Sequence, residues 1–193
     1  MLPIILASQS PRRKQLLEWA EVSFQVVARE TAETYPGHLP IEDIPVYIAR
    51  AKANAVRDDV GTDRIILAAD TVVVVDEQII GKPKDPADAI RMLSLLSGRQ
   101  HRVITGVVIV RDEQEHSFSE ITEVSFHPLS REQIRFYVEK YKPFDKAGAY
   151  AIQEWIGVTG IEFIRGDFYN VMGLPVSRVV QVLKQFPDGG QIG

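Results

Sequence analysis

The sequence predicts an α/β or α+β fold in which a mixed, strongly twisted sheet is flanked by helices. Short apolar runs typical of buried strands alternate along the chain with segments of helical periodicity. Several of the helical segments also carry recognisable start and stop signals. No Pro/Gly-rich linker divides the 193 residues. We therefore expect a single domain over residues 1–193, in which any two lobes share the sheet.

The first elements follow from the N-terminal third of the chain. The apolar run at residues 3–7 predicts a short buried strand, and a helix is expected from about Pro11 to Ala20. Ser10 is suited to cap that helix because its hydroxyl accepts from a free first-turn amide, and proline is favoured in the first turn. Residues 24–28 predict a second strand. The next helix is expected to bury one stripe, formed by Ile44, Ile48, Ala51 and Ala55.

The middle of the chain is dominated by strands. Residues 64–82 are strongly β in character, with a single acid, Asp70, inside the apolar run. A helix follows, with Asp85 as its cap and Gly98 as its stop signal. Its inward residues are expected to be Ala89, Ile90, Leu93 and Leu96. Paired strands around a polar turn are predicted at 101–110 and 116–129.

The last third predicts shorter elements. Ser130 and Gln133 have the spacing of a capping box, which begins a helix ending near Tyr141. Short β segments are expected at 147–153, 161–164 and 167–172. A final helix begins at Pro175, with Val179, Val182, Leu183 and Phe186 facing inward.

Composition limits the class of protein. The hydrophobic fraction of 45% and the charged fraction of 25% are ordinary for a globular domain. A net charge of −4 argues against general nucleic-acid binding, and the absence of cysteine excludes disulfides, thiolate metal sites and a cysteine nucleophile. The N-terminal apolar run is too short for a signal peptide, and no stretch is long enough to cross a membrane. We expect a cytoplasmic protein with neither nucleic acid nor membrane as partner.

A cluster of cations stands at the start of the first helix. Arg12, Arg13 and Lys14 follow the predicted cap, where the helix dipole normally favours acids. A strand that turns into a helix is a common anion site, and Ser8 and Ser10 add hydroxyl donors. The two arginines have planar guanidinium groups suited to phosphate oxygens. The pattern favours a phosphate or polyphosphate site over the alternative of a solvated basic surface.

Acids form the second group of candidates. Asp70 interrupts a buried run, where an ionised carboxylate is costly unless it is paired, bound to metal or exposed at a strand end. A structural role for Asp70 stays equally open. Glu30 and Glu33 could hold a divalent cation together with Asp70, since hard cations take oxygen ligands. Solvated loop acids are the simpler interpretation of these two glutamates.

The remaining motifs are weaker. Lys82 and Lys84 could reach a phosphate, but two solvated lysines on a turn are the default, and the stretch "IIGKPKD" is not a P-loop. The four histidines show no metal spacing. The residues alone therefore indicate a phosphate-handling α/β protein without a nucleophile. A reaction that needs only activated water and charge neutralisation fits best.

Six segments, in matching order, resemble the signature segments of the Maf proteins. They are "LASQSPRRKQLL", "AADTVVVVD", "IGKPKD", "LSGRQHRVITGV", "DKAGAYAIQ" and "GDFYNVMGLP". The resemblance covers the chain from residue 4 to about 186. It implies a mixed sheet with flanking helices and a central cleft, similar to the fold of the inosine triphosphate pyrophosphatases. It also implies that members are often homodimers.

The activity implied by this resemblance is that of a nucleoside triphosphate pyrophosphatase. Such enzymes cleave between the α- and β-phosphates, with a divalent metal cation (Mg²⁺ or Mn²⁺) as cofactor, and release a monophosphate and pyrophosphate. Thr71 and Gln153 resemble the dTTP/UTP subfamily rather than the subfamily that acts on 7-methyl-GTP. The expected substrates are therefore dTTP and UTP, with modified pyrimidine nucleotides as further candidates.

The resemblance also implies roles for individual residues. Asp70 matches the proton acceptor. The specificity positions match Arg12, Thr71 and Gln153, and the other pocket positions match Ser8, Arg13, Glu33, Lys52 and Lys82. Together with Ser10, the basic residues are expected to bind phosphate, and Glu33 and Asp70 are expected to bind the metal. The segment Glu154–Val158 departs from the family pattern, and its bulky Trp155 could alter base preference or a dimer contact.

Two other classes compete with this assignment. One is a non-catalytic nucleotide-binding regulator of cell division or septum formation. A carboxylate repels a nearby phosphate group unless a metal ion or a proton lies between them. Asp70 and Glu33 therefore argue against a protein that only binds nucleotide. The other is a kinase-like transferase, which lacks support because the chain has no Walker A motif.

Overall fold

The computed structural model describes residues 2–186, and the chain divides into two compact units. Among the described residues, unit 1 comprises residues 2–70, 105–120 and 173–186. Unit 2 comprises residues 71–104 and 121–172. The expectation that both belong to a single domain stays a prediction.

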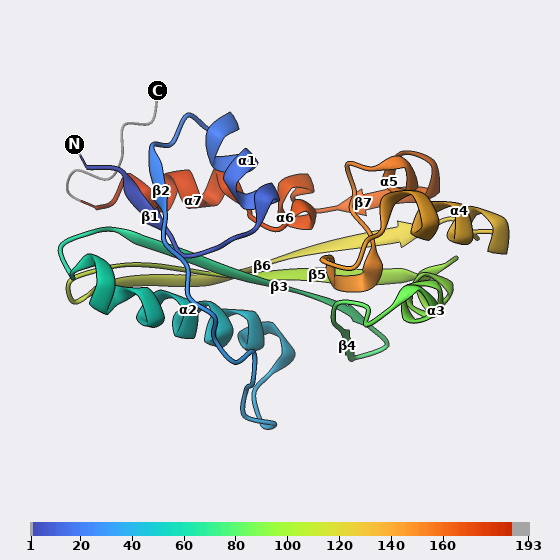
Figure 1. Cartoon of the computed structure of the whole chain (residues 1–193), viewed down its shortest axis with the longest axis horizontal. Helices are drawn as coiled ribbons and strands as arrows, with labels where there is room; N and C mark the ends of the chain where they lie inside the picture. Colours follow the sequence, from blue (N-terminus) through green and yellow to red (C-terminus); the bar gives the residue numbers. More distant parts are fainter. Residues whose placement is uncertain (1, 187–193) are drawn as a thin grey trace. The chain divides into compact units, whose positions relative to one another are not determined.

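The secondary structure alternates strands and helices (Figure 1). The strands are β1 (Ile4–Leu6), β2 (Phe24–Val26), β3 (Ile66–Val75), β4 (Gln78–Ile80), β5 (Gln100–Arg111), β6 (Gln114–Phe126) and β7 (Ile161–Arg165). The α-helices are α1 (Pro11–Trp19), α2 (Ile44–Val60), α3 (Pro86–Leu96), α4 (Arg131–Tyr141), α5 (Trp155–Gly160), α6 (Phe168–Met172) and α7 (Val176–Leu183). Two short 3₁₀ turns are η1 (Ile41–Asp43) and η2 (Ala147–Ala149).

Within the described residues, the strands form one seven-stranded sheet in the order β2-β1-β3-β5-β6-β7, with β4 paired to β3. Strand β1 runs parallel to both β2 and β3, whereas β4 is antiparallel to β3 and β7 is antiparallel to β6. The sheet is therefore mixed, and the predicted fold class is confirmed. Because consecutive strand residues point to opposite faces, burial of β1 and β3 requires cover on both sides.

In unit 1, α2 covers one face of the strands, and α1 and α7 lie on the other side (Figure 1). The cluster under α2 contains Ala49, Ala53 and Val56 from the helix, together with Ile5, Ala7, Ile66, Ala68, Val108 and Val110 from the strands and the residue after β1. The helix comes very close to β5 at Gly106, where an added Cβ would lie 2.1 Å from the backbone nitrogen of Val46. This close packing sets the position of α2, which carries Lys52.

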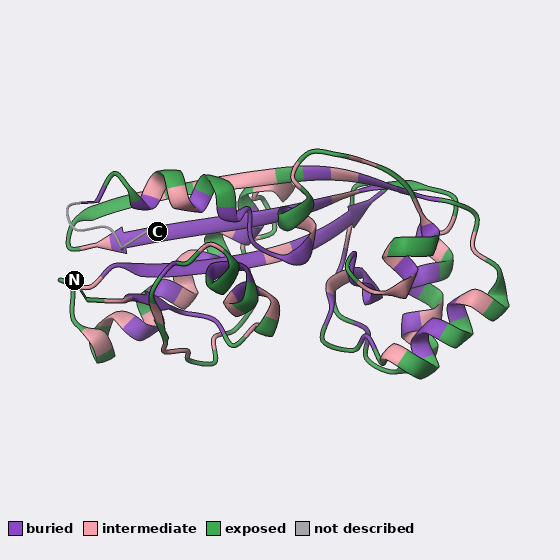
Figure 2. Cartoon of the chain, turned by 90° about the horizontal axis from the view of Figure 1, so that it is seen from above, coloured by how far each residue is buried: buried purple, intermediate pink, exposed green. Residues whose placement is uncertain are grey.

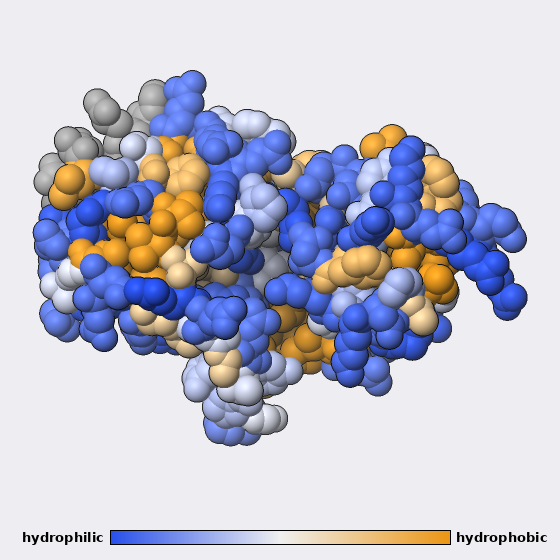
Figure 3. Space-filling model, in the orientation of Figure 1, coloured by the Kyte–Doolittle hydropathy of each residue, from blue (hydrophilic) through white to orange (hydrophobic). Residues whose placement is uncertain are grey.

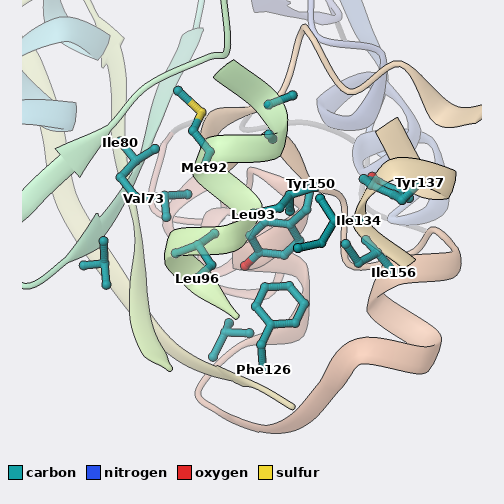
Figure 4. Packing of buried hydrophobic residues seen from close by; sticks show 14 of the residues in the cluster. Val73, Ile80, Met92, Leu93, Leu96, Phe126, Ile134, Tyr137, Tyr150 and Ile156 are labelled. Atoms are coloured by element: carbon teal, nitrogen blue, oxygen red, sulfur yellow. The ribbon is translucent and has the colours of Figure 1, made fainter. Parts of the chain in front are cut away.

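Unit 2 has its own hydrophobic core, formed by α3, α4, the strands beside them and the segment around Tyr150 (Figure 4). The residues labelled in the figure include Leu93 and Leu96 of α3, Ile134 and Tyr137 of α4, and Phe126 of β6. Phe126 packs edge-to-face on Tyr150, with ring centroids 5.1 Å apart. The core therefore reaches directly to the segment that carries Gln153.

The capping signals in the sequence are confirmed. Ser10 caps α1, Asp85 caps α3, and Ser130 and Gln133 form the capping box of α4. The buried stripe of α2 was predicted only in part, because Ala49 and Ala53 are fully buried whereas Ala51 and Ala55 are half-buried. In α3 and α7, Ile90 and Val182 are likewise only half-buried.

Two predicted β segments were wrong. Residues 147–153 form the η2 turn and an irregular segment, and residues 168–172 form α6. Helix α5 was not predicted. The long β segment at 64–82 is a hairpin of β3 and β4, whose turn residues Asp76 and Glu77 both have positive φ.

Strands β1, β3 and β5 are largely buried, whereas β2, β7 and the first part of β6 are intermediate or exposed, and the helices expose their outer residues (Figure 2). The face in Figure 3 is mostly hydrophilic, with apolar residues in smaller groups. Across residues 2–186, none of the helices combines the length and the apolar character that crossing a membrane requires.

Candidate active site

The first part of the site is the turn between β1 and α1. The chain stays buried from Ile4 to Ser8 and then enters the helix. The Ser8 hydroxyl accepts from the backbone N–H of Ser10 at 3.2 Å, and the Ser10 hydroxyl accepts from the N–H of Arg13 at 3.4 Å. The first turn of α1 contains no acid. The positive end of the helix dipole therefore adds to the charge of the arginines that follow.

Arg13 is held rigidly in this turn and is only 8% exposed. Its Nε donates to the carbonyl of Gly173 at 2.8 Å, and its Nη1 donates to the Ser8 hydroxyl at 3.2 Å. Burial lowers the pKa of Arg13; Asp70 and Glu33 oppose this effect, and Arg12 adds to it. The same residues that were predicted to bind phosphate and metal therefore lie within electrostatic range of one buried guanidinium group.

Gly173 is a contact that the sequence analysis missed. Its stretch contains glycines that favour turns and the proline that precedes α7, which a purely structural role would explain. The carbonyl of Gly173 instead anchors Arg13 from a position 160 residues away in the chain. No local pattern indicates such a backbone contact.

The second part of the site joins Lys52 to two acids. Lys52 Nζ lies 2.6 Å from Asp70 Oδ1 and 3.0 Å from Glu33 Oε1. The side chains of Asp70 and Lys52 are 11% and 17% exposed, whereas that of Glu33 is 49% exposed. Asp70 is therefore a nearly buried carboxylate that is paired with a cation, which removes most of the cost of burying it.

The two carboxylates suit a divalent cation. Both are oxygen donors, and both already converge on a single positive charge, the ammonium group of Lys52. In the part of the chain that the structure describes, no three His, Cys, Asp or Glu side chains form a metal cluster. A metal bound by Asp70 and Glu33 would therefore need further oxygen ligands, which substrate phosphates and water supply in Mg²⁺ sites.

The other predicted site residues belong to unit 2. Thr71 is half-buried and follows Asp70 in β3, so the two side chains point to opposite faces of the strand. Lys82 is exposed after β4, and Gln153 is exposed before α5. The N–H of Gly148 donates to the carbonyl of Gly81 at 3.0 Å, which links the backbone segments that carry Lys82 and Gln153.

The structure thus brings the predicted residues of unit 1 together. They are Ser8, Ser10, Arg12, Arg13, Glu33, Lys52 and Asp70. Lys82 and Gln153 belong to unit 2, where one backbone hydrogen bond joins their segments, and Thr71 lies next to Asp70 in the chain. That the residues of both units act on one substrate stays a prediction.

An α/β fold with a rigid arginine at a helix N-terminus, beside two acids paired with a lysine, defines a phosphate-handling class of protein. The chain belongs to the Maf-like protein family, whose model matches residues 3–186. The predicted family is therefore confirmed.

Relatives support the same membership. The chain is 52% identical over 182 residues to a dTTP/UTP pyrophosphatase of Cytophaga hutchinsonii, with 94% of this chain and 83% of the relative covered. It is 48% identical over 188 residues to a dTTP/UTP pyrophosphatase of Porphyromonas gingivalis, with 96% and 94% covered. Among solved structures, a HAM1 protein from Coxiella burnetii has a TM-score of 0.55 at 16% identity, with 96% of this chain and 100% of that chain covered. This structural likeness shows a shared fold.

Proposed function

We propose that the chain hydrolyses dTTP and UTP to the nucleoside monophosphate and pyrophosphate. The observation that carries the proposal is the pairing of Asp70 and Glu33 with Lys52, within electrostatic range of the buried guanidinium group of Arg13. The names of the similar proteins support the same activity. This geometry supports the proposal because phosphoryl transfer requires charge neutralisation and a positioned proton acceptor, which are the roles proposed for the cations and for Asp70.

Substrate binding begins with the cations. Arg13 cannot turn freely because Gly173 and Ser8 hold its guanidinium group, so it offers a pre-oriented donor to phosphate oxygens. Arg12 and the N-terminus of α1 add positive charge beside it. A triphosphate also gives Lys52 a new anionic partner. When the Lys52 ammonium group contacts the phosphate in place of Asp70, the Asp70 carboxylate can accept a proton.

In the chemical step, Asp70 removes a proton from a water molecule as the water oxygen attacks the α-phosphorus. The bond between the α-phosphorus and the bridging oxygen breaks, and that oxygen leaves as part of pyrophosphate. Asp70 and Glu33 would hold the divalent cation, Mg²⁺ or Mn²⁺, which when bound neutralises phosphate charge and lowers the pKa of water. Lys82 would neutralise further charge on the polyphosphate.

Base selection is assigned to Arg12, Thr71 and Gln153. Uracil and thymine share one hydrogen-bonding edge, with a carbonyl at C4 beside an N–H at N3. A glutamine amide matches that edge, since its NH₂ donates and its carbonyl accepts. Cytosine carries an amino group in place of the C4 carbonyl, so the same amide orientation leaves a mismatch. This accounts for acceptance of both dTTP and UTP by one site.

The test is product analysis of dTTP and UTP hydrolysis in isotopically labelled water. The proposal expects monophosphate and pyrophosphate as products, with the labelled oxygen in the monophosphate. Diphosphate and inorganic phosphate, or label in pyrophosphate, would show attack at another phosphorus. Thermal stabilisation by dTTP without any turnover would favour the non-catalytic regulator. A cytoplasmic location and a homodimer remain part of the proposal.

A further inference from the structure

Gln153 lies in a turn whose ends are held by one buried hydroxyl group. The turn runs from Ala151 to Glu154, and the N–H of Glu154 donates to the carbonyl of Ala151 at 3.1 Å. Gln153 is exposed within it. The N–H of Ala151 donates to the Tyr137 hydroxyl at 3.2 Å, and that hydroxyl donates to the Glu154 carboxylate. The Tyr137 hydroxyl therefore contacts both the first and the last residue of the turn.

Tyr137 is suited to a fixed anchor. It belongs to α4, is fully buried, and stacks on Tyr141 with ring centroids 5.0 Å apart. Burial, followed by the contact with the Glu154 carboxylate, raises the pKa of the Tyr137 hydroxyl above its ordinary value. The hydroxyl therefore keeps the proton that it donates to Glu154 at all pH values near neutrality.

Glu154 is held from a second side. Its other carboxylate oxygen lies 3.5 Å from Lys146 Nζ, and Lys146 is only 9% exposed. Lys146 also contacts Asp145 at 2.8 Å. Helix α5 packs closely against the turn, because a Cβ on Gly157 would lie 1.8 Å from the carbonyl oxygen of Ile152. This close packing restricts the backbone of the turn. The turn is thus held by side chains and by close backbone packing.

The ring and the hydroxyl of Tyr137 have separate structural roles. The ring packs in the core, which a phenylalanine would also achieve. The hydroxyl makes no contribution to apolar packing, yet it satisfies the N–H of Ala151 and a carboxylate oxygen of Glu154. Its loss would leave a buried amide without its partner and would loosen the backbone on both sides of Gln153.

We propose that Tyr137 is a positioning residue for base selection, which acts by fixing the turn that carries Gln153, with Glu154 as its partner. The inference rests on the proposed function, since it assumes that Gln153 contacts the base. Glu154 stands where this chain departs from the family pattern. The Glu154 carboxylate links the turn to both Tyr137 and Lys146.

The experiment compares Tyr137→Phe with Tyr141→Phe, which removes a hydroxyl from the neighbouring ring of the same helix. Selectivity is measured as the ratio of kcat/KM for dTTP to that for dCTP. We expect Tyr137→Phe to lower this ratio roughly fivefold to tenfold, mainly through a higher KM for dTTP. Tyr141→Phe should leave it unchanged. Glu154→Gln, which retains an acceptor for the Tyr137 hydroxyl, should lower it less than Glu154→Ala.

Hydrogen exchange gives a readout that does not depend on activity. Tyr137→Phe should accelerate exchange of the Ala151 and Glu154 amides, whereas Tyr141→Phe should not. Equal exchange and equal selectivity in the two variants would overturn the inference. If the wild type released no pyrophosphate, the proposed function would fail. The exchange rates, and a comparison of dTTP binding by Tyr137→Phe and Gln153→Ala, would then decide the role of Tyr137 separately.

Discussion

Lys52 is the residue on which the arrangement of the acids depends. Its ammonium group contacts both Asp70 and Glu33, and its side chain is mostly buried. Without a cation between them, two nearby carboxylates repel each other, and a buried one is costly to ionise. Lys52 therefore holds in place a pair of oxygen donors that a divalent cation can also use.

We predict that Lys52→Met increases the stabilisation of the protein by Mn²⁺ in the absence of nucleotide. Removal of the ammonium group takes away the cation that contacts both carboxylates, so a divalent ion gains affinity there. Thermal melts with and without Mn²⁺ measure the effect. We expect the Mn²⁺-induced rise in Tm to exceed that of the wild type by roughly 2–6 °C.

The control is Lys184→Met, which removes an exposed lysine beyond the end of α7. It should show the same Mn²⁺ response as the wild type. If Lys52→Met gave no larger response than Lys184→Met, Asp70 and Glu33 would not form a shared cation site.

At the scale of elements, two capped helices allow stability to be separated from substrate binding. Ser10 caps α1 in the candidate site, and Ser130 caps α4 in unit 2. Each hydroxyl accepts from the backbone N–H three residues later. Replacement of either cap by alanine should therefore cost a similar amount of stability, about 1 kcal/mol.

We predict that Ser10→Ala also raises the KM for dTTP, since it loosens the helix start that we propose binds phosphate. Ser130→Ala should leave KM unchanged. Denaturant titrations and steady-state kinetics on both variants check this. An equal KM in the two variants, despite equal loss of stability, would remove the start of α1 from the substrate site.

Elements with strong local signals could be predicted from the sequence. The caps of α1, α3 and α4 were identified because Ser and Asp side chains satisfy the first free amides wherever a helix starts. The apolar runs of β3 and β5 were identified because a continuous run of β-branched residues needs burial on both faces. These features depend on residues close in the chain.

The segments that were predicted wrongly depend on distant contacts or on a missed cap. Residues 167–172 contain Phe, Tyr and Val, which favour strands. The structure forms α6 there because the Asp167 carboxylate accepts from the N–H groups of Tyr169 and Asn170. The Asn170 amide then donates to the carbonyl of Val103 and to the Thr122 hydroxyl. Only the Asp167 cap was visible in the sequence.

The segment at 147–153 was wrong for a different reason. Gly148 and Ala149 both have positive φ, which a strand does not allow. Gly148 lies against Val73, and its N–H donates to Gly81, so contacts far apart in the chain determine this backbone. The candidate site residues could be chosen from sequence motifs. The pairing of Lys52 with both acids could not be predicted from the sequence, because the position of α2 is set by its close approach to Gly106.

At the scale of the whole molecule, His101 makes the folded chain sensitive to acid. The ring is 2% exposed, stacks on Phe126 and contacts the Tyr150 hydroxyl through Nε2 at 2.7 Å. Burial lowers the pKa of His101 to about 4. In the unfolded chain a histidine has a pKa of about 6.5.

We predict that the free energy of unfolding falls as the pH decreases from about 6.5 to about 4, because only the unfolded state binds a proton on His101 in that range. Above that range the full stability is present, and below it the loss levels off, at a total of about 3 kcal/mol. His101→Gln should remove most of this slope. Denaturant titrations across the range measure it.

The matched control is His38→Gln, which changes an exposed histidine. It should retain the wild-type slope. A slope that survives in His101→Gln would assign the acid sensitivity to other groups.

The proposed reaction depends on Asp70 as its proton acceptor. The most direct measurement is pyrophosphate release from dTTP and UTP by the wild type and by Asp70→Asn, with dTTP binding measured on both. The asparagine retains the shape and a hydrogen-bond acceptor for Lys52 but cannot take a proton from water. We predict that turnover falls at least about 10²-fold while dTTP still binds. Near-wild-type turnover by Asp70→Asn would show that Asp70 is not the proton acceptor.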